Sequence, residues 1–360
     1  MADGARIMRD SFGTLPDGRA VERVVLHGEN GFEARIITCG AALQALLVPD
    51  SNGMCDDVVL GHDALAGYLG KRQFFGATVG RYANRIANAR FVLDGETVRL
   101  NANDGAHALH GGPDGFDRKL WQIAEIEDGA QPAATLLYVS GDGEENYPGR
   151  LDVRVTYRLT GPTELSVLFT ARTSRKTIVN LTNHSFFNLD GVSAGTDILD
   201  HRLTVAAEHV LAIDASAIPL QQPPRAVAGT PFDFREPAAI GARIRSDDQQ
   251  LWHGRGYDHN FCLQGDRNVR LAARLEAPRA GRVLELLTDQ PGLQVYSGNY
   301  LDGSNGGKGR LYRQSDAICL EPQVWPDAPN RPEFPSAELL PDGVYRHQTV
   351  YRFSIVGAGT

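Results

Sequence analysis

Residues 151–159 read LDVRVTYRL, with an apolar side chain at every odd-numbered position. Successive side chains of a β-strand point to opposite faces, so only a half-buried strand brings these apolar groups onto one face. Residues 344–355 have a similar composition and are rich in Val, Tyr and Phe. This alternation predicts a chain that is built mainly from strands.

Other strand-like runs follow one another along the chain, separated by turn residues. We expect further strands at 34–38, 42–48, 57–60, 90–93, 134–139, 164–171, 269–275, 282–288 and 318–320. The turn signals are PDSNG at 49–53, LDGE at 93–96, GDG at 141–143 and YPG at 147–149. Helical signals are few and short, at 63–68 and 237–245.

Strands and helices do not alternate, which argues against a parallel doubly wound sheet. The expected fold class is therefore all-β, a large antiparallel sandwich or barrel with few short helices. The sequence shows no repeat, charged tail or linker, and we read the Pro- and Gln-rich segment 219–230 as a surface loop. We expect a single domain over residues 1–360.

The charge balance excludes several classes of partner. The chain carries 36 Lys and Arg against 44 Asp and Glu, a net charge of -8. Nucleic-acid binding needs a basic surface, and an acidic protein is not attracted to an anionic membrane. There is no apolar run of about 18 residues, and the N-terminal MADGARIMRD has no apolar signal core. We expect a cytoplasmic protein without nucleic-acid or membrane partners.

The cysteines give no sign of a redox or zinc motif. No pair has C-x-x-C spacing, and three of the four lie in apolar strand-like runs, where a small buried thiol is the expected role. The four are Cys39, Cys55, Cys262 and Cys319.

Two polar clusters in the first third of the chain can be read in more than one way. GRYANRIAN at 80–88 is either a solvated turn or a source of guanidinium groups for an oxygen-rich ligand. HALHGG at 107–112 contains two histidines, which titrate near neutral pH and can bind metal, although a lone histidine is more often structural. The two glycines after His110 allow the backbone to approach a ligand closely.

A third cluster, NLTNHSFFNL at 180–189, crowds three asparagines and a histidine into a strand-like stretch. Asn is disfavoured in strands, and a buried Asn needs hydrogen-bond partners. In a continuous strand, Thr182, His184 and Phe186 would share one face, opposite Asn183, Ser185 and Phe187. We interpret this stretch as the wet wall of a ligand site.

Two further clusters contain carboxylates. YDHNF at 257–261 is either a polar turn before a strand or part of a site. Glu321 in ICLEPQ at 318–323 is either the residue after a strand end or a carboxylate whose partial desolvation makes it more basic.

Several motif-based functions lack their required context. The histidines and acids do not have H-E-x-x-H or H-x-H spacing, so we expect no metal. GVSAG at 191–195 matches G-x-S-x-G, but no helical run follows it, and we read a turn rather than a nucleophile elbow. The glycine-rich segment 303–309 contains Lys308 but lacks P-loop spacing.

Taken together, the polar clusters resemble motifs of the aldose 1-epimerase (galactose mutarotase) family, in the family's order and over nearly the whole chain. The matching segments are GRYANRIANARF at 80–91, LHGG at 109–112 with GFD at 115–117, NLTNHSFFNL at 180–189, GTPFDFR at 229–235, DHNF at 258–261, PGLQVYSGNY at 291–300 and LEPQVWPDAPN at 320–330. The segment IPLQQ at 218–222 departs from the Pro-Thr-Gly turn that the family often has there, and this difference bears on substrate preference.

The resemblance implies a β-sandwich of curved antiparallel sheets with a sugar cleft on a concave face. It implies interconversion of the anomers of free aldoses by acid–base ring opening and closure, without a cofactor. Glu321 matches the family's base and His184 its acid, which must carry a proton. The matches for sugar binding are Asn84, Arg85, His110, Asp258 and Gln294. His107 and His259 lie beside matched positions without being matched themselves.

Rival functions remain open at the level of sequence. A hexose-6-phosphate 1-epimerase of the same fold needs a second basic cluster for the phosphate, which Arg85 alone does not supply. A non-catalytic sugar-binding protein need not keep both Glu321 and His184. A glycosidase would use two carboxylates, such as Asp258 and Glu321. The oligomeric state is left as monomer or homodimer.

Overall fold

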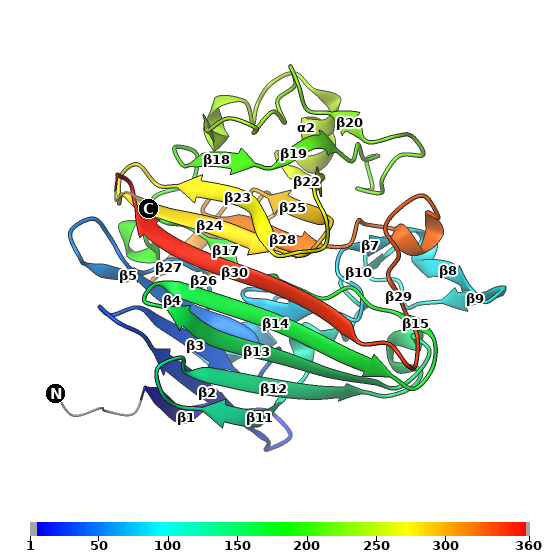
Figure 1. Ribbon diagram of the computed structural model, residues 1–360, viewed down its shortest axis with the longest axis horizontal. Coiled ribbons are helices and arrows are strands. Elements are labelled where there is room, and N and C mark those ends of the chain that lie inside the picture. The colour runs from blue at the N-terminus through cyan, green and yellow to red at the C-terminus, as the bar shows by residue number, and fades with distance from the viewer. Residues whose placement is uncertain (1–5, 358–360) are drawn as a thin grey trace.

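The computed structural model describes residues 6–357, which form antiparallel sheets with only short helices (Figure 1). The largest sheet has nine strands in the order β11 (Gln122–Glu127), β12 (Ala133–Ser140), β13 (Leu151–Gly161), β14 (Glu164–Thr173), β30 (Tyr345–Ile355), β24 (Arg282–Thr288), β23 (Arg270–Glu276), β18 (Arg202–Val205) and β21 (Ala238–Ala239). On β13 the odd-numbered residues from Leu151 to Leu159 are buried, as the alternation predicts.

Two further sheets lie against the nine-stranded sheet. One has the order β1 (Ile7–Thr14), β2 (Ala20–His27), β3 (Glu33–Ile37), β4 (Ala42–Pro49) and β5 (Cys55–Asp57). The other has the order β17 (Phe186–Phe187), β28 (Ile318–Gln323), β25 (Gly292–Tyr296), β22 (Asp258–Leu263), β19 (Ala207–Val210) and β20 (Arg225–Ala226).

The remaining strands form separate two-stranded ladders. The pairs are β6 (Ala77–Val79) with β16 (Thr182–His184), β7 (Arg85–Ile86) with β10 (Ala108–Leu109), β8 (Arg90–Leu93) with β9 (Glu96–Arg99), β15 (Thr177–Ile178) with β29 (Glu338–Leu339), and β26 (Asp302–Gly307) with β27 (Arg310–Arg313). The helices are α1 (Leu65–Leu69), α2 (Gln249–Gly254) and the 3₁₀ turns η1 (Ala87–Ala89), η2 (Phe116–Arg118), η3 (Glu144–Asn146), η4 (Val192–Ala194), η5 (Ile240–Ala242) and η6 (Ala328–Asn330).

One apolar core joins the three large sheets. It includes Leu26 on β2, Phe169 on β14 and Val295 on β25, and in sequence it extends from Val24 to Phe353. An all-β sandwich is thus confirmed, because sheets share a core across their facing sides. The single domain expected over 1–360 stays a prediction, and residues 1–5 and 358–360 lie outside the described part.

Several expected elements differ in the structure. The strand expected at 57–60 is β5, which ends at Asp57 and is followed by one isolated bridge between Val59 and Phe187. The strand expected at 318–320 continues as β28 to Gln323. The helix expected at 63–68 is the single turn α1, whereas 237–245 contains β21 and η5 instead of an α-helix.

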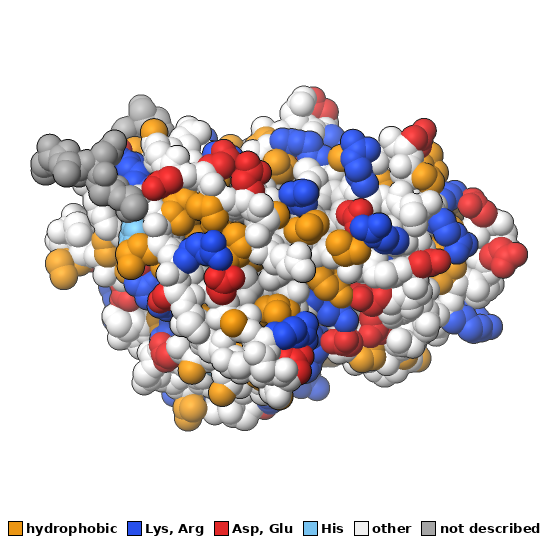
Figure 2. Space-filling view, turned by 90° about the horizontal axis from the view of Figure 1, so that it is seen from below, with side chains coloured by type: hydrophobic (Ala, Val, Ile, Leu, Met, Phe, Trp, Pro, Cys, Tyr) orange, Lys and Arg blue, Asp and Glu red, His pale blue; other side chains and the backbone are white. Residues whose placement is uncertain are grey.

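The outer surface carries charges of both signs. Figure 2 shows Lys and Arg side chains beside Asp and Glu over one face, with hydrophobic side chains scattered between them. No helix among residues 6–357 has the length and apolar character that a membrane span requires. The N-terminal residues 1–5, on which the expected lack of a signal core partly rests, are outside the described range.

Candidate active site

A cavity of about 480 Å³ opens beside the six-stranded sheet, on the face turned away from the apolar core. Its lining contains every residue that the sequence motifs assigned to a site, namely Asn84, Arg85, His110, His184, Asp258, Gln294 and Glu321. Aromatic side chains complete the wall, and these are Phe74, Phe186, Tyr296 and Tyr300. The structure therefore brings together residues that are up to 237 positions apart in the sequence, from Asn84 to Glu321.

Three adjacent strands supply the carboxylates and the amide. Glu321 on β28 lies opposite Gln294 on β25, and the Gln294 Nε2 donates a hydrogen bond of 2.7 Å to Asp258 Oδ1 on β22. The alternating neighbours Leu293 and Leu320 point into the apolar core. Period-two geometry thus explains why polar and apolar residues alternate in these strands, since one face is core and the other is cavity.

Two histidines face these carboxylates. His184 ends β16, and its Nε2 lies 3.7 Å from Glu321 Oε2. The His110 ring lies edge-on to the His184 ring at 5.2 Å between centroids. His110 follows β10 and has a positive φ of 50°. The cavity thus holds two imidazoles next to the Glu321 carboxylate.

The hydrogen bond of His110 fixes its tautomer. Its Nδ1 accepts the backbone N–H of Asn84 at 3.1 Å, so the proton of the neutral ring is on Nε2. A nitrogen of each histidine and an oxygen of Glu321 lie within 4.8 Å of one another, which is close enough to consider a metal ion. A metal-bound imidazole nitrogen must offer its lone pair while the other nitrogen donates its N–H. The bond from Asn84 imposes the reverse on His110, so these residues fit a metal poorly.

Burial governs the ionisation of the acids. The Glu321 side chain is 2% exposed, and its Oε2 has no hydrogen-bond partner within 6–357. Burial raises the pKa of Glu321 well above its usual value, and the negative charge of Asp258 adds to this effect while Arg85 opposes it. The pKa of Asp258 is also raised by burial, against the opposing effects of Arg85 and the Gln294 hydrogen bond. Glu321 is therefore a strong base once it is ionised.

Burial has the opposite consequence for the histidines. It lowers the pKa of His184 to about 4 and the pKa of His110 well below its usual value. The mechanism expected from the sequence has His184 protonated and Glu321 ionised. Burial favours the opposite protonation state, in which Glu321 is protonated and His184 is neutral. The two states differ by the transfer of one proton between Glu321 and His184, whose Oε2 and Nε2 are 3.7 Å apart.

The two arginines of the 80–88 cluster have different surroundings. Arg81 is buried and donates to backbone carbonyls of Ser140, Gly141 and Gly149, so its role is structural. Arg85 lines the cavity and its Nε donates to Asp104 Oδ2 at 2.8 Å. Burial acts to lower the pKa of Arg85, but the charges of Asp258 and Asp104 outweigh it, and the pKa is raised. Arg85 is thus a fixed cation on the cavity wall.

The interpretation of 180–189 as a wet strand is wrong for its asparagines. The stretch is two short strands, β16 and β17, which pair with β6 and β28 respectively. Asn180 bonds the backbone of Ala83 and Val324, and Asn183 Nδ2 bonds the carbonyl of Gly76 at 2.8 Å. A buried side-chain amide can form hydrogen bonds with backbone groups that have no partner in a neighbouring strand. These two asparagines therefore connect segments of backbone inside the protein. His184 and Phe186 are the members that line the cavity.

Phe74 is a cavity residue that the sequence motifs did not indicate. Its ring stacks on His184 with 5.5 Å between centroids and an interplanar angle of 19°. The Arg72 guanidinium lies 4.4 Å from the centre of the Phe74 ring, and Arg72 is paired with Asp117. The pairing of β6 with β16 brings the segment KRQFF at 71–75 close to His184. No local pattern in that segment predicts the pairing.

The loop that departs from the family pattern is anchored away from the cavity. Arg331 Nη1 donates to the carbonyls of Pro219 and Leu220 at 3.3 and 3.1 Å. None of the residues that line the cavity in the described part comes from 218–222. The loop at 218–222 therefore makes no direct contact through which it would shape the rim of this cavity, contrary to the expectation from its sequence.

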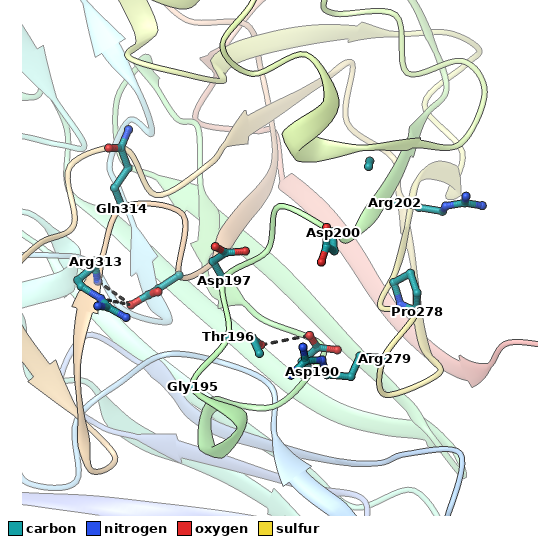
Figure 3. A pocket seen from close by; sticks show the side chains of 12 residues that line it. Asp190, Gly195, Thr196, Asp197, Asp200, Arg202, Pro278, Arg279, Arg313 and Gln314 are labelled. Atoms are coloured by element: carbon teal, nitrogen blue, oxygen red, sulfur yellow. Dashed lines mark hydrogen bonds and ion pairs between the residues drawn. The ribbon is translucent and has the colours of Figure 1, made fainter.

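A larger cavity, of about 1070 Å³, has a different lining (Figure 3). Figure 3 shows Asp190 close to Thr196 and Arg279, and the Thr196 Oγ1 donates a hydrogen bond of 3.1 Å to Asp190 Oδ2. Of its aspartates, Asp316 is paired with two arginines, Arg310 at 2.9 Å and Arg313 at 4.0 Å. The described lining includes no histidine or glutamate, so volume alone does not mark it as a catalytic site.

Comparison with known proteins agrees with this geometry. The galactose 1-epimerase from Lactobacillus acidophilus NCFM has the same fold, with a TM-score of 0.86 and 27% sequence identity over 98% of this chain and 99% of that one. The fold is therefore of the galactose mutarotase type. The galactose mutarotase of Rattus norvegicus is 45% identical, covering 97% of this chain and 99% of its own. The aldose 1-epimerase of Escherichia coli (strain K12) is 37% identical, with 94% and 96% covered. The model of the aldose 1-epimerase family matches residues 22–352, and the chain belongs to that family.

Proposed function

We propose that the protein interconverts the α and β anomers of free aldoses of the glucose and galactose type, as an isomerase without a cofactor. The observation that carries this proposal is the buried pair of Glu321 and His184, whose Oε2 and Nε2 are 3.7 Å apart at the cavity wall. Membership of the aldose 1-epimerase family supports the same activity.

Ring opening requires two proton movements. The hydroxyl on carbon 1 loses its proton to Glu321, and the ring oxygen receives a proton from His184 as its bond to carbon 1 breaks. The open aldehyde turns about the bond between carbons 1 and 2. Closure on the other face reverses both proton transfers, so Glu321 and His184 return to their starting state and no electrons are gained or lost.

Sugar binding prepares the reactive protonation state. The reaction needs Glu321 ionised and His184 protonated, whereas burial favours the neutral pair. A sugar hydroxyl that donates to Glu321 stabilises its carboxylate, and the nearby cation of Arg85 acts in the same direction. The energy of binding therefore shifts the proton to His184, where the ring oxygen can take it.

The other cavity residues fit a ligand with many hydroxyls. Arg85 and the Nε2 of His110 are donors, Asp258 is an acceptor, and Asn84 and Gln294 offer amide groups. Because each sugar hydroxyl can both donate and accept, such a mixed set can hold several of them in one orientation. We assign these five residues to substrate binding.

The rival functions have weaker support. Lys71 and Arg72 lie at the cavity, but Lys71 is paired with Asp302 at 2.7 Å and Arg72 with Asp117, so neither is a free site for a phosphate. A sugar-binding protein without activity can use the unpartnered Glu321 oxygen to accept a sugar hydroxyl, but it does not need a proton carrier such as His184 beside that oxygen. Product analysis separates epimerisation from glycoside hydrolysis.

Polarimetry tests the proposal. Fresh α-glucose and α-galactose should reach equilibrium rotation faster with the protein than in the same buffer without it, while glucose 6-phosphate is accelerated less. Aryl glycosides should remain intact. Equal rates with and without protein for every aldose would leave a binding protein as the better explanation.

The remaining expectations stay predictions. They are that a free sugar is the only ligand required, that the protein is a monomer or homodimer and is cytoplasmic, and that residues 1–360 form one domain.

A further inference from the structure

Asp104 is a carboxylate at the cavity that lies outside the motifs shared with the family. It lines the cavity, and its Oδ2 accepts a hydrogen bond of 2.8 Å from Arg85 Nε. The Arg85 side chain is 11% exposed and the Asp104 side chain is 38% exposed. Ion pairs with a hydrated partner contribute little to stability, so the stability of the fold gives no strong reason for Asp104.

The backbone holds the two side chains of this pair together. Asn103 Nδ2 donates to the Leu109 carbonyl at 2.9 Å, and Asn103 Oδ1 accepts the Leu109 N–H at 2.7 Å. Leu109 on β10 is paired in turn with Arg85 on β7. Backbone hydrogen bonds of 3.1 and 2.9 Å also close a turn between Asp104 and His107. The loop that carries Asp104 is thus fixed to the ladder that carries Arg85.

The pair leaves two nitrogens of Arg85 available to a ligand. Its Nε donates to Asp104, whereas within residues 6–357 neither Nη1 nor Nη2 donates a hydrogen bond to a protein group. A guanidinium presents its donors as a rigid planar fork that suits carboxylate and hydroxyl oxygens. Asp104 therefore fixes the orientation of the fork without occupying the nitrogens that a sugar can reach.

Most other ionisable groups at the cavity are balanced in pairs. The pairs are Lys71 with Asp302, Arg72 with Asp117, and Glu321 with His184, which hold one proton between them. Arg85 remains, with Asp104 as its direct partner and Asp258 as the second acid whose charge acts on it. Asp104 therefore cancels the charge of Arg85 even when Asp258, whose pKa is raised by burial, is protonated.

We propose that Asp104 is a specificity-determining residue, which cancels the charge of Arg85 and so makes the cavity select neutral aldoses over hexuronic acids. An Arg85 without this partner would attract a sugar carboxylate to its outer nitrogens. With Asp104 in place, repulsion between the two carboxylates offsets that attraction. A neutral sugar meets no such repulsion, and its hydroxyls can still accept from Arg85. The inference rests on the proposed function, whose substrate class it narrows.

Three sugars test the role of charge. Galacturonate has a carboxylate where galactose has a hydroxymethyl group, and the methyl ester of galacturonate has nearly the same shape without the charge. Asp104→Asn removes the charge of the side chain but keeps an oxygen that can accept from Arg85 Nε. Polarimetry of each sugar, against its spontaneous rate, gives kcat/KM for the parent and the variant.

The parent should favour galactose over galacturonate, and Asp104→Asn should reduce this preference. We expect kcat/KM for galacturonate to rise about 10-fold in Asp104→Asn, because a repulsive like charge has been removed. For galactose and the methyl ester, kcat/KM should stay within about 3-fold of the parent, since neither is charged. Asp104→Ala also loses the hydrogen bond to Arg85, so it should raise KM for galactose, and Asp104→Asn should restore it.

Asp114→Asn is the matched control. Asp114 is also an aspartate in an ion pair, with Lys119 at 2.6 Å, but it does not line the cavity. The variant removes the same charge and should leave kcat/KM for all three sugars unchanged. An equal gain for galacturonate in Asp114→Asn would show that net charge of the whole protein, and not Asp104, sets the preference.

Two further results would overturn the inference. They are an unchanged ratio of galacturonate to galactose in Asp104→Asn, and a gain for the methyl ester as large as the gain for galacturonate. If the parent accelerates none of the aldoses, the proposed function fails instead, and NMR titration with the same sugars decides the role of Asp104. Galacturonate should then bind about 10-fold more tightly to Asp104→Asn than to the parent, and equal affinities would refute the role.

Discussion

Glu321 reaches the cavity from the middle of β28 with its Oε2 unpartnered, and burial raises its pKa. Glu321→Gln keeps the shape of the side chain but removes the base. We expect turnover to fall at least ~10²-fold, the lower range for general acid–base catalysis, while sugar binding persists. Turnover is measured by polarimetry against the spontaneous rate, and binding by calorimetry. Activity close to that of the parent would refute the mechanism.

The same substitution should stabilise the fold. From the sequence alone the variant is expected to melt like the parent, but a buried carboxylate without partners costs free energy. Since the folded pKa of Glu321 lies above its unfolded value near 4.5, its ionisation removes stability as pH rises through that range. Glu321→Gln should therefore melt ~3 °C or more above the parent at pH 8, with a smaller gap at pH 5. Glu29→Gln, at an exposed position, is the control.

The two histidines of HALHGG differ in position. His110 lines the cavity, whereas His107 lies outside it and its Nδ1 accepts the Asn88 backbone N–H at 3.0 Å. His110→Ala should raise KM and lower kcat, and His107→Ala should be milder in both. Steady-state kinetics on galactose make the comparison. A larger loss in His107→Ala would show that the wrong histidine of this loop has been assigned.

The hydrogen bond of Asn84 to His110 Nδ1 also bears on metal. With that nitrogen occupied, activity should survive prolonged dialysis against EDTA, because His110 cannot offer a lone pair at Nε2 without losing its proton. Activity is assayed before and after dialysis, and after adding zinc or magnesium. Loss on dialysis that either metal restores would contradict the cofactor-free mechanism.

At the scale of elements, the turn after β10 sets the position of His110. Gly111 has a φ of +87°, and a Cβ there would meet the Gly80 carbonyl oxygen at 1.9 Å. Alanine at this position must push apart the turn and the segment that leads to Asn84 and Arg85. Gly105 also has a positive φ, of +59°, but a Cβ there meets nothing within 4 Å.

The two glycines form a matched pair for an experiment. Both variants place an alanine in the left-handed region, which destabilises each of them by a similar amount. Only Gly111→Ala adds a clash of its Cβ with the Gly80 carbonyl oxygen. We expect Gly111→Ala to be about 2–3 kcal/mol less stable than Gly105→Ala in urea denaturation, and to lose activity as well. Equal stabilities would mean that the turn moves freely and does not position His110.

Elements with a regular pattern were predictable from the sequence, and those defined by distant partners were not. The alternation in β13 needs only its own residues, because one face is buried. The stretch 180–189 breaks into β16 and β17 because its halves pair with β6 and β28, which are remote in sequence. The six-residue helix α2 depends on Asp248, whose side chain accepts the Gln250 N–H, and is too short for a periodic signal.

The site residues were predictable from their motifs, but their ionisation was not. Motifs name Glu321 and His184 without saying how much water reaches them. Desolvation depends on the sheets, the aromatic neighbours and the β6–β16 ladder together, and it reverses the expected location of the proton. The position of Phe74 beside His184 likewise follows from the pairing of β6 with β16.

For the whole molecule, burial of histidine predicts sensitivity to acid. Six histidines have lowered pKa values, chiefly through burial, and they are His62, His110, His184, His201, His259 and His347. The pKa of His259 falls to about 3 and that of His184 to about 4. Between these values and about 6.5 the unfolded chain binds more protons than the folded one, so stability falls as pH falls.

Urea denaturation at pH 7.5, 6 and 5 tests this. Raised carboxyl pKa values at Asp258, Glu321 and Asp327 act in the opposite direction, but they are fewer. We therefore expect the free energy of unfolding to decrease from pH 7.5 to pH 5 by more than ~2 kcal/mol. A constant value over this range would mean that these histidines are more hydrated than their burial indicates.

The place of β30 has a consequence for synthesis on the ribosome. It lies between β14 and β24 in the nine-stranded sheet, yet it is translated after every other strand of that sheet. Until Tyr345–Ile355 leaves the exit tunnel, β14 and β24 are open edges, and such edges can pair with other nascent chains. The sheet therefore closes only after its last strand has been translated, and on a polysome, where many nascent chains lie close together, these open edges favour misassembly.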